Sequence, residues 1–163
     1  MGQTGATEPA NPIDAFASSV KSGANWFFWI AGLSAVNSIV SAFQGEWGFV
    51  VGLGATQLID GIAAAIIAET EGGTGTTVTA VALVIDLLIA SVFVLFGILA
   101  NKRMGWAFVI GMVIYLFDGL LFLLVGDWLS LAFHAFALFC IFSGYAALKK
   151  LNEAEAFAGA GAM

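Results

Sequence analysis

The sequence predicts an all-α integral membrane protein, a transmembrane bundle of five apolar helices, and two observations lead to this fold class. First, 61% of the 163 residues are hydrophobic and only 10% are charged, whereas a soluble domain carries about 25% charged residues. Second, the apolar residues fall into runs of about 20, the length at which a helix crosses a ~30 Å hydrocarbon core. Backbone groups inside lipid must satisfy their own hydrogen bonds, so each run is predicted to be helical.

The five apolar runs cover residues 25–44, 48–68, 78–100, 105–125 and 129–148. Short polar or glycine-rich breaks separate them, which leaves no room for an extramembrane domain between helices. Residues 1–23 are predicted to form a flexible polar tail with a short helix over 14–21. Residues 24–150 form the membrane domain, and the acidic, then Ala/Gly-rich residues 151–163 are predicted to form a flexible tail.

The first run leaves the number of spanning helices open, because polar residues recur on one face of it. Ser34, Asn37, Ser38 and Ser41 fall at helical spacing. Such a stripe fits a spanning helix that packs its polar face on its neighbours, or an amphipathic helix lying in the membrane interface. The run lacks the Lys/Arg face of surface helices, which favours spanning. The bundle therefore has five spans, or four spans plus one interfacial helix.

The distribution of basic residues predicts the orientation. Lys102 and Arg103 follow the third run, Lys149 and Lys150 follow the fifth, and the positive-inside rule places them in the cytoplasm. The C-terminus is therefore expected to be cytoplasmic, in a plasma or inner membrane. Lys21 would lie outside if the first run spans, and inside if it is interfacial. Five tryptophans at predicted helix ends are expected to anchor the helices at the membrane interface: Trp26, Trp29, Trp47, Trp106 and Trp128.

Four ionisable side chains lie inside the apolar runs: Asp60, Asp86, Asp118 and His134. If each run crosses the membrane, all four fall in its non-cytoplasmic half, ~3–8 Å from the midplane. Tyr115 and Gln57 lie one turn before Asp118 and Asp60. Three adjacent carboxylates cannot all stay ionised in a low dielectric. This layer would therefore hold protons or bind a cation, or else its protonated aspartates and neutral histidine would hydrogen-bond the helices together.

Two further patterns concern the second apolar run. Gly48, Gly52, Thr56 and Ala64 form, with Asp60, a stripe of small residues every fourth position, which predicts close helix packing. The run also resembles the fourth: Trp47 precedes the pair Asp60-Gly61 much as Trp106 precedes Asp118-Gly119. This similarity suggests a parallel internal repeat, a feature of some transporter folds.

The sequence carries no catalytic motif, so we do not expect an enzyme, and it predicts neither a metal site nor a cofactor. Its net charge of −6 argues against binding to nucleic acid. The expected partners are the lipid bilayer and either further copies of the chain or a larger membrane complex. Two functional hypotheses follow: an oligomeric or accessory subunit, and a small proton- or cation-coupled transporter or channel that uses the Asp/His layer. A water-filled path to that layer would favour transport.

Overall fold

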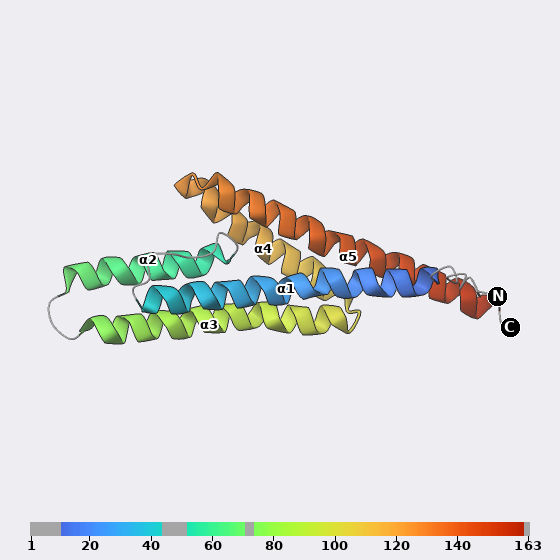
Figure 1. Ribbon diagram of the computed structural model, residues 1–163, viewed down its shortest axis with the longest axis horizontal. Coiled ribbons are helices and arrows are strands. Elements are labelled where there is room, and N and C mark those ends of the chain that lie inside the picture. The colour runs from blue at the N-terminus through green and yellow to red at the C-terminus, as the bar shows by residue number, and fades with distance from the viewer. Residues whose placement is uncertain (1–10, 44–51, 71–73, 162–163) are drawn as a thin grey trace, which may run out of the picture.

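The computed structural model describes residues 11–43, 52–70 and 74–161. Within these ranges the chain is helical and contains no strand, which confirms the all-α prediction there (Figure 1). The described helices are α1 (Pro12–Ala42), α2 (Gly54–Glu69), α3 (Thr74–Asn101), α4 (Gly105–Val125) and α5 (Trp128–Ala160).

Three of these helices are long and apolar enough to cross a membrane. They are α3, α4 and α5, with mean hydropathies of 2.8, 2.5 and 1.8 over their most apolar stretches. This composition is compatible with an integral membrane protein. The other two do not qualify: α1 mixes apolar residues with polar and charged ones, and α2 has only 16 residues. The prediction of five membrane-spanning helices is thus supported for three of them.

The first and last helices are longer than the sequence predicts. Helix α1 begins at Pro12, with the Asn11 side chain accepting a hydrogen bond from the Ile13 N–H. The short helix predicted over 14–21 is therefore the start of α1, since proline suits the first turn of a helix as well as a loop. Helix α5 likewise continues to Ala160, through Ala and Glu residues of high helix propensity and with Leu151 fully buried. Both extensions occupy segments that were predicted to be flexible tails.

Helix α1 packs along both α3 and α5. The Phe27 ring is fully buried among the rings of Phe93, Phe96 and Phe108, with centroids 6.0 to 6.4 Å away. Burying one large apolar side chain stabilises a fold in water by about 1.5–3 kcal/mol. Inside lipid that gain is smaller, and close packing between helices becomes the main attraction.

Helix α2 runs in the same direction as α1, which the alternating topology did not predict. The Leu53 N–H bonds to Ser34, and seven residues further along both helices Asp60 lies beside Ser41. The second apolar run therefore does not return across the bundle after the first. The helix starts deep inside the bundle, next to Asp118, which lies ~20 Å along α4 from Gly105.

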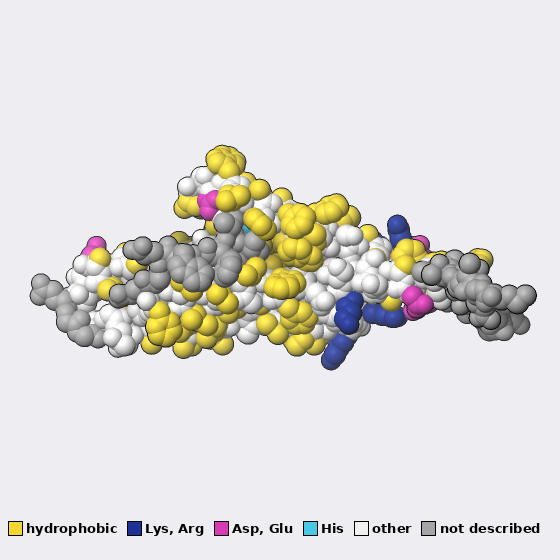
Figure 2. Space-filling view, viewed as in Figure 1, with side chains coloured by type: hydrophobic (Ala, Val, Ile, Leu, Met, Phe, Trp, Pro, Cys, Tyr) yellow, Lys and Arg dark blue, Asp and Glu magenta, His cyan; other side chains and the backbone are white. Residues whose placement is uncertain are grey.

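This direction brings all basic residues to one end of the molecule. The start of α1, the α3–α4 connection and the end of α5 lie at the same end (Figure 1). They carry the 5 Lys and Arg residues of the chain, and Figure 2 shows these side chains gathered toward that end. Lys21 thus lies at the same end as the other four basic residues although α1 runs the length of the bundle. The sequence-based alternatives had placed Lys21 with these residues only if the first run was interfacial.

Candidate functional site

The polar residues predicted to form one layer are divided between two clusters at different levels. Asp118 and His134 lie at the start of α2, level with Ser34 of α1. Asp60 and Asp86 lie beside Ser41 and Ser38. Ser38 and Ser41 follow Ser34 by four and seven residues, so the second cluster lies ~6–10 Å further along α1. The single layer is therefore wrong, because it assumed that α2 crosses the membrane in the opposite direction.

The first cluster holds the start of α2. The Asp118 carboxylate accepts hydrogen bonds from the Gly54 N–H at 2.7 Å and the Ala55 N–H at 2.9 Å, while the Ser34 hydroxyl accepts one from the Leu53 N–H at 2.7 Å. The first N–H groups of a helix lack partners within it, and the partial positive charge there favours an anion. We call Ser34, Asp118 and His134 the capping cluster.

His134 completes this cluster from α5. Its Nε2 lies 3.0 Å from Asp118 Oδ2, and its Nδ1 lies 2.9 Å from the Ser130 carbonyl oxygen. A carbonyl oxygen can only accept, and Asp118 already accepts two N–H groups. Both ring nitrogens of His134 therefore have a hydrogen-bonding partner inside the bundle. The Tyr115 ring stacks on the imidazole, with the ring centroids 4.3 Å apart.

Small residues make room for the capping cluster. A Cβ on Gly119 would lie 3.0 Å from His134, so any larger residue there would displace the imidazole. Both carboxylate oxygens of Asp118 and both ring nitrogens of His134 have partners. The geometry therefore favours the structural hypothesis for these two residues. Tyr115 packs its ring on His134, but its buried hydroxyl has no partner among the described residues.

Ser130 links the capping cluster to the start of α5. The Asp127 carboxylate accepts hydrogen bonds from the Ser130 hydroxyl at 2.6 Å and the Ser130 N–H at 3.1 Å. These two bonds lower the pKa of Asp127 below its ordinary value, and the bond from the hydroxyl has the larger effect. Asp127 therefore stays ionised at neutral pH and caps the helix that carries His134.

The second cluster differs because the buried carboxylate at its centre has no partner in hydrogen-bonding geometry among the described residues. Asp86 of α3 has no exposed surface, and Ser38 of α1 is 1% exposed. Among the described residues, neither carboxylate oxygen of Asp86 nor the Ser38 hydroxyl has a partner in hydrogen-bonding geometry. The Asp60 carboxyl of α2 lies close enough to interact with Asp86 through its charge. Buried polar groups are nearly always paired, so this cluster, Asp60, Asp86, Ser38 and Ser41, is chemically incomplete. We call it the carboxyl-pair site.

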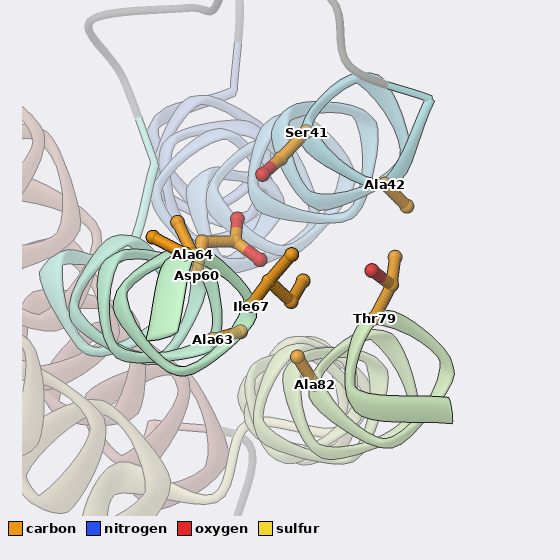
Figure 3. Close-up of a pocket in the computed structure, with 9 residues that line it drawn as sticks. Ser41, Ala42, Asp60, Ala63, Ala64, Ile67, Thr79 and Ala82 are labelled. Atoms are coloured by element: carbon orange, nitrogen blue, oxygen red, sulfur yellow. The ribbon is translucent and has the colours of Figure 1, made fainter. Parts of the chain in front are cut away.

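A cavity adjoins the carboxyl-pair site. It has a volume of about 280 Å³, and Figure 3 shows the Asp60 carboxyl and the Ser41 hydroxyl side by side at its edge, with Thr79 across from them. The lining residues are Ser41, Ala42, Asp60, Ala63, Ala64, Ile67, Ala68, Thr79 and Ala82. A water molecule takes up about 30 Å³ of liquid, so the cavity has room for hydrated ions. Asp86, which interacts with Asp60, is not among the lining residues.

The remaining members of the predicted site and packing stripe have separate surroundings. Gln57 is exposed and belongs to neither cluster. Gly52 packs closely on α1, since a Cβ there would lie 2.8 Å from the Asn37 side chain. The buried Thr56 hydroxyl donates a hydrogen bond to the Leu53 carbonyl oxygen. Ala64 lines the cavity. Gly48 lies outside the described residues.

The role of the tryptophans as interface anchors stays a prediction. Trp106 and Trp128 lie at the start of α4 and α5, but Trp26 and Trp29 lie near the middle of α1, because that helix begins at Pro12. Trp29, Trp106 and Trp128 are more than half exposed, while Trp26 packs edge-on against Phe136. Trp47 lies outside the described residues. The repeat of the second and fourth runs stays a prediction, and its two aspartates have different roles: Asp118 caps α2 and Asp60 faces Asp86.

The serines of α1 are the site residues whose importance the sequence understated. Ser34 and Ser38 are buried, and each faces a different polar cluster. The signal was present in the polar stripe of the first run, but it was interpreted as packing or interfacial character. A comparison with protein-family models, curated proteins and solved structures finds no match to this chain.

Proposed function

We propose that the protein is an integral membrane protein that moves protons or small cations across the bilayer. The observation that carries this proposal is the start of α2 inside the bundle, parallel to α1, with its first N–H groups bound to Asp118. Discontinuous helices that begin near the membrane midplane are typical of transporters, where they flank the binding site. A purely structural subunit has no need of such a break.

The proposal places α1 across the membrane together with α3, α4 and α5. Helix α1 packs along α3 and α5, so it shares their depth, and its Ser34 and Ser38 face protein rather than lipid. Helix α2 reaches from mid-membrane to the opposite surface. All 5 basic residues then lie on one side, which we assign to the cytoplasm together with both ends of the chain.

Within this arrangement, the carboxyl-pair site supplies the charge and the cavity supplies access. Ionisable groups inside a membrane are costly and are usually retained for ion or proton pathways. Asp60 borders a cavity with room for water, while Asp86 lies deeper with unpartnered oxygens. An ion entering the cavity would meet Asp60 first and Asp86 next.

Flux measurements in proteoliposomes test this proposal. We expect vesicles with the wild-type chain to show proton or Na⁺ flux under an imposed gradient, followed with an internal pH dye and with radioactive sodium. Asp86→Asn should lower that flux about tenfold or more, because it removes the more deeply buried carboxylate. A tenfold slower flux corresponds to an activation barrier higher by ~1.4 kcal/mol.

Asp14→Asn is the matched control, since Asp14 is an exposed carboxyl in the first turn of α1. It should leave the flux unchanged. Equal size-exclusion profiles of the three proteins would show that folding is not the variable. If wild-type vesicles move no protons, Na⁺ or K⁺, transport is refuted and the role of an oligomeric or accessory subunit takes its place.

A further inference from the structure

We infer that the carboxyl-pair site binds a hard, oxygen-liganded cation, an alkali or alkaline-earth ion, in competition with protons. The inference rests on the proposed function, because it names the ligand of the same site. It depends on two fully buried polar groups beside Asp60, the Asp86 carboxyl and the Ser38 hydroxyl, which lie next to each other but have no partner in hydrogen-bonding geometry among the described residues.

The donor atoms determine the class of cation. Asp60 and Asp86 contribute carboxylate oxygens, and Ser38 and Ser41 lie beside them with hydroxyl oxygens. Within the described residues, no group of three or more His, Cys, Asp or Glu could hold a metal ion. Oxygen ligands without sulfur or imidazole suit hard cations rather than transition metals. Mg²⁺ is less suitable than Na⁺ or Ca²⁺, because it gives up its water shell reluctantly.

The buried position of the pair explains the competition with protons. Two neighbouring carboxylates in a low-dielectric interior cannot both remain charged without compensation. The compensating positive charge is a proton when no cation is present, and a bound cation replaces it. Among the described residues, the Asp86 oxygens have no hydrogen-bond donor in suitable geometry. The Asp118 oxygens, by contrast, are bonded to the first N–H groups of α2 and to His134.

The two clusters therefore have different roles although both contain aspartate. Each oxygen of Asp118 already accepts at least one hydrogen bond from the chain. A cation at Asp118 would have to displace the imidazole or uncap α2. The carboxyl-pair site requires no such displacement, and the cavity beside Asp60 connects it with space for water-sized molecules.

Carbodiimide labelling of the full chain in detergent tests the inference. Dicyclohexylcarbodiimide adds to a protonated carboxylic acid, and the adduct rearranges to an N-acylurea that keeps all atoms of both reactants. We expect peptide mapping by mass spectrometry to locate the label on Asp60 or Asp86. Labelling should fall about tenfold when Na⁺ or Ca²⁺ exceeds its dissociation constant by about tenfold, compared with N-methylglucamine at the same ionic strength and pH.

Raising the pH should also lower labelling, because the reagent requires the protonated acid. Asp14→Asn should label as the wild type does, whereas Asp86→Asn should lose the cation protection of Asp60. Labelling that no cation reduces would overturn the inference, yet it would leave proton flux intact. The absence of label on both residues at acidic pH would overturn it as well. Protection by cations without any flux in vesicles would support the binding site and refute transport.

Discussion

Asp118→Ala is expected to lower the free energy of unfolding by about 3 kcal/mol or more, because leaving a buried donor or acceptor without a partner costs about 1–3 kcal/mol and three such groups lose theirs. The substitution removes the acceptor for the Gly54 and Ala55 N–H groups and the partner of His134 Nε2. Thermal or denaturant unfolding in detergent, followed by circular dichroism, measures the loss.

Two further variants separate the contributions to this effect. Asp118→Asn keeps a side-chain oxygen for one N–H group, so its loss should be smaller. The double variant Asp118→Ala/His134→Leu should recover part of the stability, because no buried imidazole nitrogen is then left without a partner. A change below about 0.5 kcal/mol for Asp118→Ala, the size typical of surface substitutions, would contradict the capping cluster.

Gly144→Leu is expected to separate α1 from α5 and to cost about 3 kcal/mol or more, beyond the usual range for overpacking. A Cβ on Gly144 would lie 2.7 Å from the Gly23 Cα, and a Cβ on Gly23 would lie 2.5 Å from the Gly144 Cα. These contacts are with backbone, which cannot move aside as a flexible side chain can. The same unfolding assay measures the effect.

Gly32→Ala is the matched control for this contact. Gly32 lies on α1, and a Cβ there would meet nothing within 4 Å. The change should be neutral or stabilise the helix by about 0.8–1 kcal/mol, the difference in propensity between Gly and Ala. Equal losses for Gly144→Leu and Gly32→Ala would show that the close approach of α1 and α5 does not contribute to stability.

Hydropathy alone predicted the three most apolar helices closely. The run predicted over 105–125 is the observed α4, and those over 78–100 and 129–148 lie within α3 and α5. Membrane helices satisfy their backbone locally, so their extent depends mainly on the chain's own composition. The extensions of α1 and α5 were missed because helix propensity, rather than hydropathy, determines those ends.

The direction of α2 could not be predicted in this way. It depends on hydrogen bonds between distant parts of the chain, such as that from Gly54 to Asp118, 64 residues away. The sequence identified Asp60, Asp86, Asp118 and His134 as the important polar residues. It could not pair them, because pairing requires the direction of every helix.

The central claim is that α2 is a half-helix parallel to α1. Measuring which side of the membrane each helix end reaches tests this claim most directly. In a Cys140→Ala background, single cysteines at Asp14, Glu69 and Glu153 would be labelled with an impermeant maleimide in sealed vesicles of known orientation. All three native residues are exposed. A half-helix α2 parallel to α1 predicts that Asp14→Cys and Glu153→Cys react from one side and Glu69→Cys from the other. Reaction of Asp14→Cys and Glu153→Cys from opposite sides would mean that the second run crosses the membrane alone, and would contradict the account.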